Sequence, residues 1–130
     1  MSILIIEVIN LYSNIIVDKS LEFSINIVNM YNKIPASQHD LSRQLLRSAT
    51  SIGANVKEGS KAISGAEFNN KMSIALKEAN ETEYWLELMS ATNIIDKKSS
   101  EQLLKSCSEL CKILNAIVKT TLHNSIPNKR

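Results

Sequence analysis

Lysine and arginine side chains recur at regular spacings in two segments of the chain, and cations in such rows can neutralise the phosphates of a nucleic acid. In residues 40–61, Arg43, Arg47 and Lys57 follow spacings of four and three, with the small residues Thr50 and Ala54 between them. On a helix these positions lie within about 80° of arc. The segment therefore predicts a basic strip along one side of a helix.

A second row, in residues 96–130, consists of Lys98, Lys105, Lys112 and Lys119 at intervals of seven. Seven residues are close to two helical turns, so these lysines also share one side. The segment holds seven Lys and Arg against three acids, although the whole chain has a net charge of only +2. This segregation favours binding of RNA or DNA without base reading, because no aromatic platform accompanies the cations. The alternative is that the lysines only solvate the outside of a helical protein.

Residues of catalytic type do not combine into a known site. Glu78 and Glu81 resemble a carboxylate pair, as do Glu83 and Glu87. A di-iron site in a helical bundle needs a Glu-x-x-His on each of two helices, and no such pair is present. No nucleophile is matched with a base and an orienting third group. We therefore expect a protein that is not an enzyme and needs no cofactor.

The two cysteines, Cys107 and Cys111, stand four residues apart and share one side of a helix. Two thiolates could hold a metal, but zinc needs two further ligands, and His39 and His123 are far away in the sequence. We expect the cysteines to lie in or beside a core, with no metal. Residues 1–17 resemble neither a signal peptide nor a membrane span. The chain is thus expected in the cytoplasm, with reduced thiols.

These candidate residues must be positioned by helices. The chain of 130 residues is 44% hydrophobic and 22% charged, which is typical of one packed domain. Apolar residues recur at spacings of three and four in four segments, about 16–34, 40–59, 64–92 and 99 to before Pro127. The core residues so predicted are Ile16, Ser20, Phe23, Ile27, Met30 and Ile34; Leu41, Leu45, Ala49, Ile52 and Val56; Phe68, Met72, Ala75, Ala79, Thr82, Leu86 and Met89; Leu103, Cys107, Leu110, Leu114, Ile117 and Thr121.

Four amphipathic helices with short connections predict an all-α fold, an antiparallel up-and-down four-helix bundle. Capping boxes predict helix starts at Ser64 and at Ser99. In the first helix, Val17, Leu21 and Val28 widen the apolar face that should pack inward. The bundle is assigned to residues 14–124, followed by a basic tail, 125–130. Residues 1–13 form an arm, as a strand or as an extension of the first helix.

The third predicted helix also carries bulky apolar residues away from its inner seam. Ile74, Trp85 and Leu88 lie there among charged side chains, while the seam itself is lined by small residues. Tryptophan is enriched at the centres of interfaces, so this surface predicts self-association into a homo-oligomer. The alternative is that Trp85 fills the edge of the bundle.

Four stretches of the sequence, taken in order, resemble a known family. They are 41–49 (LSRQLLRSA), 51–59 (SIGANVKEG), Glu67-Phe68 and 75–86 (ALKEANETEYWL). Together they are similar to the four-helix-bundle proteins encoded in 23S ribosomal RNA intervening sequences, the S23 ribosomal protein-like family, over about Asn14 to Leu122. The amino-terminal arm departs from the usual start of these proteins. The family is in turn similar to the accessory variability determinant of diversity-generating retroelements.

The resemblance implies several properties that the residues alone do not. It implies a homopentamer that binds nucleic acid through a basic surface and, in a retroelement context, contacts a reverse transcriptase. It implies that Arg43, Arg47 and Lys57 face phosphates, and that Asn55, Glu58 and Gly59 serve structure at the end of the second helix. We expect a protein that binds itself and RNA or DNA but no membrane. A protein-interaction scaffold remains the alternative function.

Overall fold

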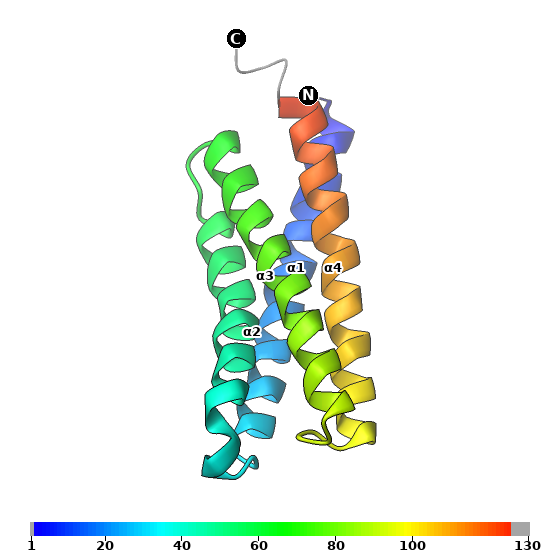
Figure 1. Cartoon of the computed structure of the whole chain (residues 1–130). Helices are drawn as coiled ribbons and strands as arrows, with labels where there is room; N and C mark the ends of the chain where they lie inside the picture. The colour runs from blue at the N-terminus through cyan, green and yellow to red at the C-terminus, as the bar shows by residue number, and fades with distance from the viewer. Residues whose placement is uncertain (1, 126–130) are drawn as a thin grey trace.

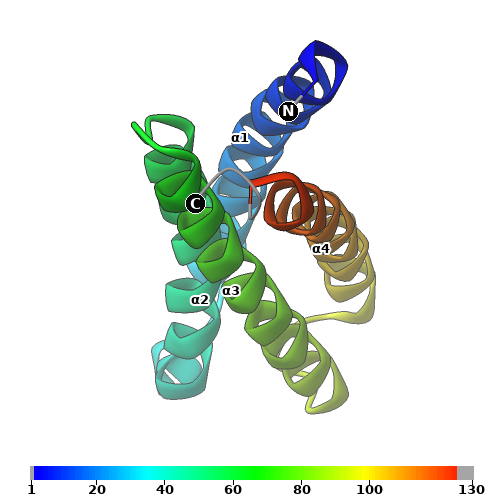
Figure 2. The same ribbon diagram turned by 90° about the horizontal axis from the view of Figure 1, so that it is seen from above.

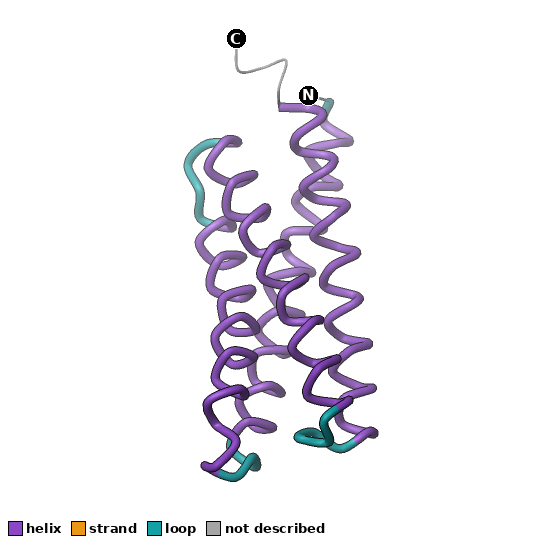
Figure 3. The backbone as a smooth tube through the Cα atoms, in the orientation of Figure 1, coloured by secondary structure: helices purple, strands orange, loops and turns teal. Residues whose placement is uncertain are grey.

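The computed structural model is an all-helical bundle, and it describes the backbone of residues 2–125 and the side chains of residues 2–121 (Figure 1). The elements are α1 (Ile3–Tyr31), a short 3-10 helix η1 (Ala36–Gln38), α2 (His39–Ser60), α3 (Gly65–Ala91) and α4 (Lys97–Ser125). Residues 2–125 contain no strand (Figure 3). The predicted fold class is therefore confirmed, while residues 126–130 of the predicted tail lie outside the described part.

The helices form a closed square of neighbours. α1 packs on α2, α2 on α3, α3 on α4, and α4 returns to α1, whereas the backbones of the diagonal pairs are not close neighbours over the described residues. Seen from above, the four axes surround one central space (Figure 2). Short loops join consecutive helices, so neighbours run antiparallel, and the start of α1 and the end of α4 lie at the same end of the bundle as the α2–α3 loop (Figure 1).

The core fills this central space with the residues that the helical spacing predicts. Of that predicted set, only Met30, Leu41 and Phe68 are partly rather than fully buried, and these three pack against the core cluster. The expectation for the wider face of α1 is wrong in part. Leu21 and Val28 are exposed, because α1 presents only one narrow side to α2 and α4. Val17 is half-buried against the core.

The amino-terminal arm is a direct extension of the first helix. α1 starts at Ile3, and the Ser2 hydroxyl accepts a hydrogen bond from the Ile5 amide at 3.2 Å, which satisfies one of the free N–H groups at a helix start. Of the two alternatives for this segment, the helical one is therefore correct.

The cap of α3 is as predicted, and the cap of α4 is not. Ser64 accepts the Glu67 amide at 3.1 Å. α4 begins at Lys97 rather than after Ser99, because the Asp96 carboxylate accepts the Ser99 amide at 2.9 Å. A carboxylate also matches the positive end of the helix dipole, so Asp96 outcompetes Ser99 as the cap. This hydrogen bond holds the pKa of Asp96 below its usual value.

The end of α2 is held closely against the start of α3. Gly59 is buried, and a Cβ atom at its position would lie 3.1 Å from both Lys71 Cβ and Met72 Cε. Its φ angle is not positive, so the site requires glycine for space rather than for backbone freedom. Nearby, Glu58 pairs with Lys71 at 3.1 Å, and the Asn55 amide donates to the Ser51 carbonyl at 2.8 Å. Asn55, Glu58 and Gly59 thus serve the structure of this helix end.

Candidate nucleic-acid interface

The lysine row of α4 lies on the side of the helix that faces away from the core. All four of its lysines are exposed, whereas the core positions of α4 lie on the opposite side. Intervals of seven residues place successive lysines about 10.5 Å apart along the helix axis. The row therefore spans about 30 Å of one surface. We call Lys98, Lys105, Lys112 and Lys119 the α4 lysine row.

The positive charge of this row is largely unopposed. Within residues 2–121, none of its four lysines forms an ion pair. Glu109, a nearby acid on α4, is paired with Lys19 of α1, and this carboxylate raises the pKa of Lys19. Glu101 is exposed and shares the side of the row, so it offsets one of the four charges. The arrangement leaves a cationic surface accessible to phosphates.

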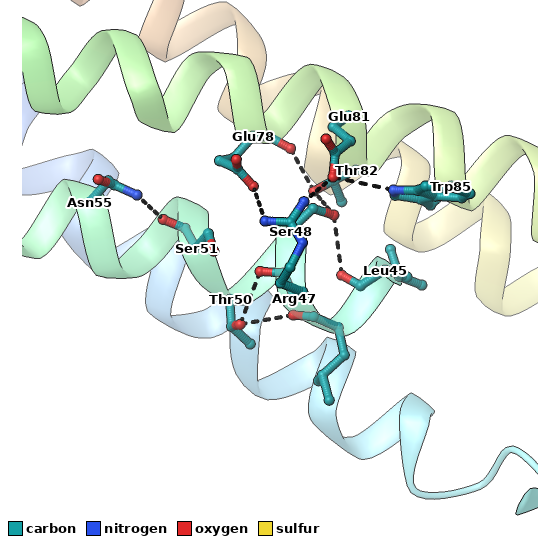
Figure 4. Close-up of polar contacts among 11 residues, drawn as sticks. Leu45, Arg47, Ser48, Thr50, Ser51, Asn55, Glu78, Glu81, Thr82 and Trp85 are labelled. Atoms are coloured by element: carbon teal, nitrogen blue, oxygen red, sulfur yellow. Dashed lines mark hydrogen bonds and ion pairs between the residues drawn. The ribbon is translucent and has the colours of Figure 1, made fainter. Parts of the chain in front are cut away.

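The predicted basic strip of α2 is exposed but mostly neutralised. Arg43 pairs with Asp40 at 3.4 Å. Arg47 reaches across to α3, where its guanidinium pairs with Glu78 at 3.2 Å and also with Glu81 (Figure 4). Lys57 is exposed and has no ion-pair partner within residues 2–121. Of the three cations predicted to face phosphates, only Lys57 therefore lacks an ion-pair partner within residues 2–121.

Arg47 belongs to a polar contact between α2 and α3. Figure 4 shows Glu81 between the Arg47 guanidinium and the Trp85 indole, whose N–H donates to Glu81 at 3.4 Å. Beneath them, the buried Thr82 hydroxyl lies 2.9 Å from the Ser48 hydroxyl and donates to it. Glu78 and Glu81 are therefore bound in ion pairs that join two helices.

The surface predicted for self-association is half-buried. Trp85 packs against the core cluster and meets the Tyr84 ring edge-on at 5.1 Å between centroids. Ile74 and Leu88 are also partly covered. Trp85 thus occupies the edge of the bundle, and the assignment of these three residues to an interface stays a prediction.

The cysteines lie where the sequence places them. Cys107 is buried and its thiol donates to the Ala79 carbonyl at 3.3 Å, while Cys111 is half-buried beside the core. The hydrogen bond between the two thiols raises the pKa of Cys107 and lowers the pKa of Cys111. Burial raises the pKa of Cys107 further. The described residues contain no cluster of three or more His, Cys, Asp or Glu side chains able to hold a metal.

The sequence reasoning missed the exposed apolar surface of α1. Ten large apolar side chains are exposed among the described residues, and eight of them belong to α1. These eight are Ile3, Leu4, Ile6, Val8, Leu11, Leu21, Ile25 and Val28. One signal was available, because the apolar residues of α1 occur on every side of the helix, which exceeds what one packed face needs. None of the described helices is long and apolar enough to span a bilayer.

Comparisons with known proteins agree with this fold. A family model described as 23S rRNA-intervening sequence protein matches residues 13–116. A crystal structure of a protein of unknown function from the S23 ribosomal protein family of Bacteroides thetaiotaomicron is 48% identical, with a TM-score of 0.78. The similarity covers 83% of this chain and 98% of that one. No curated protein matches the chain.

Proposed function

The chain belongs to the 23S rRNA-intervening sequence protein family, and from that premise we propose that it is a non-enzymatic protein that binds RNA or DNA through the α4 lysine row. The observation that carries the proposal is the row itself. It presents four exposed lysines at even spacing, and no acid within residues 2–121 pairs with them. Such a row contacts phosphates and releases counterions, which gives binding that is independent of base sequence.

The α2 strip contributes less in this proposal. A phosphate that binds Arg47 must compete with Glu78 and Glu81, and one that binds Arg43 must compete with Asp40. Replacing Arg47 with glutamate would also bring three carboxylates together on the α2–α3 contact. Arg47 is therefore a poor position for testing binding, whereas the α4 lysines can be changed without loss of an ion pair.

The test is a titration of fluorescently labelled structured RNA and duplex DNA, followed by anisotropy at low salt. The variant Lys105→Gln with Lys112→Gln removes two charges from the middle of the row. The control, Lys61→Gln with Lys77→Gln, removes two exposed charges elsewhere on the bundle. We expect the first variant to bind at least tenfold more weakly than the control, because each lost phosphate contact removes counterion release. Equal affinity of the two variants would refute the proposal.

Self-association is part of the same proposal, because several copies would present several lysine rows to one nucleic acid and raise the overall affinity. The exposed apolar side chains of α1 support it, because eight of them on one helix present more apolar surface than single scattered residues would.

The alternative function is a protein-interaction scaffold, to which the same α1 surface is suited. A scaffold would assemble normally and bind neither RNA nor DNA at any salt concentration. The titration therefore separates the two functions, since only the nucleic-acid binder depends on the α4 lysine row.

A further inference from the structure

A groove of about 470 Å³ lies between the end of α1, the α3–α4 loop and the first turns of α4. Amide side chains line it from both helices, Asn26 and Asn29 from α1 and Gln102 from α4. All three residues are exposed and, over residues 2–121, their amide groups form no hydrogen bond within the protein. The groove therefore offers free donors and acceptors, and its volume is that of a small-molecule site.

 

The remaining lining of this α1–α4 groove is largely apolar. Ile34, Ile95 and Leu103 are buried in the core, and Met30 and Ile94 pack against it. A flat ring can lie on such an apolar floor while its edge reaches the amides. A nucleobase has this character, because its faces stack on apolar groups and its edges carry donors and acceptors.

The charges in the α1–α4 groove cancel. Lys33 of α1 and Asp96 at the start of α4 are the cation and the anion of its lining. The pKa of Asp96 is lowered mainly by the Ser99 hydrogen bonds, and the charge of Lys33 contributes, so these two groups lie near each other. A carboxylate repels a phosphate but accepts hydrogen bonds from the N–H groups of a base. The groove is therefore better suited to a base than to a phosphate.

Gln102 connects the α1–α4 groove to the α4 lysine row. Lys98 precedes it by four residues and Lys105 follows it by three, so both lysines are its neighbours on the surface of the helix. The two lysines are about 10.5 Å apart along the helix axis. A strand whose phosphates contact Lys98 and Lys105 therefore passes directly beside the groove.

We propose that the α1–α4 groove receives an unpaired base of the nucleic acid that the α4 lysine row binds. Asn29 and Gln102 contact the edge of this base, and the apolar floor covers one of its faces. The inference rests on the proposed function and adds to it, because the lysine row alone contacts phosphates and no base. It predicts a preference for bulges and loops over a fully paired duplex, since a base must leave the stack to enter the groove.

The test compares three forms of one labelled RNA hairpin by fluorescence anisotropy at a single low salt concentration. One form is fully paired, the second has a bulged guanosine, and the third has an abasic site in place of that guanosine. Guanine presents donors for Asp96 and an acceptor for Lys33. The abasic form keeps the bulged backbone, so its comparison with the guanosine form isolates the base. We expect the unchanged protein to bind the guanosine form about tenfold more tightly, the effect of about two net hydrogen bonds.

The variant Asn29→Ala with Gln102→Ala removes the two amides that the proposal assigns to the base. It should abolish the tenfold difference and leave the affinities for the abasic and fully paired hairpins unchanged. The matched control is Gln44→Ala with Asn70→Ala, which removes one glutamine and one asparagine that are exposed outside the groove. This control should keep the tenfold difference. Circular dichroism checks that both variants are folded.

Failure of this inference is distinguishable from failure of the proposed function. If the unchanged protein bound the guanosine and abasic forms equally, or if the difference survived in Asn29→Ala with Gln102→Ala, the base site would be refuted. Binding of the paired hairpin that weakens in Lys105→Gln with Lys112→Gln would then leave the proposed function intact. If none of the three hairpins bound, both the base site and the proposed function would be wrong.

Discussion

Replacing Gly59 with alanine tests whether the α2–α3 contact requires the absence of a side chain. In a helix, alanine is favoured over glycine by up to about 1 kcal/mol. At Gly59 the new methyl group would lie 3.1 Å from Lys71 Cβ and from Met72 Cε. Met72 Cε ends a flexible side chain, but Lys71 Cβ moves only with the α3 backbone. Overpacking of this kind costs about 1–3 kcal/mol, so we expect a net loss on the order of 1 kcal/mol.

The matched control is Gly65→Ala, because nothing lies within 4 Å of the added Cβ atom there. We expect that variant to gain about 0.5 kcal/mol. A loss of 1 kcal/mol lowers the Tm of a chain of this size by about 4 °C. Calorimetry at one fixed protein concentration compares the two, since self-association would also shift Tm. If Gly59→Ala were as stable as Gly65→Ala, the close-approach reasoning would be refuted.

Three further predictions concern caps and thiols. Ser64→Ala should lower the free energy of unfolding by about 1 kcal/mol in urea titrations, whereas Ser64→Asp should leave it unchanged, because aspartate is also a good N-cap. If both variants lost the same free energy of unfolding, the Ser64 hydroxyl would not be the cap. The pKa of Asp96 is lowered in the folded state, so its stabilising effect is present above the unfolded pKa of about 3.9 and is lost as pH falls through the folded pKa. Asp96→Asn should flatten that part of the stability profile, and an unchanged profile would contradict this assignment. Iodoacetamide should modify Cys111 before the buried Cys107, as mass spectrometry of peptides would show; the reverse order would contradict the directions of their pKa shifts.

The fold was predictable because the core depends on local spacing. Each helix repeats apolar residues every three or four positions, and those positions are the buried ones, as Leu45, Ile52, Leu110 and Leu114 show. The start of α4 was less predictable, since Asp96 and Ser99 are both good caps within three residues. Their competition is decided by charge and geometry that spacing does not contain.

The candidate site was predictable only in part, because local spacing does not show which residues of different helices come into contact. The exposure of the α4 lysine row follows from its position opposite the core of the same helix. The ion pairs of Arg47 could not be predicted in this way, because Glu78 and Glu81 lie 31 and 34 residues away on another helix. The exposed side of α1 is likewise decided by how α1 packs on α2 and α4, and the sequence does not show which side of a broadly apolar helix stays exposed.

The most direct test of the proposed function is the salt dependence of duplex DNA binding. If four lysines of a row contact phosphates, the logarithm of the binding constant should fall with the logarithm of salt concentration, with a slope of about −3.6 for one row. Lys105→Gln with Lys112→Gln removes half of each row, so the slope should fall to about half its value, whatever the number of copies. A slope near zero, or one that this variant leaves unchanged, would contradict the account.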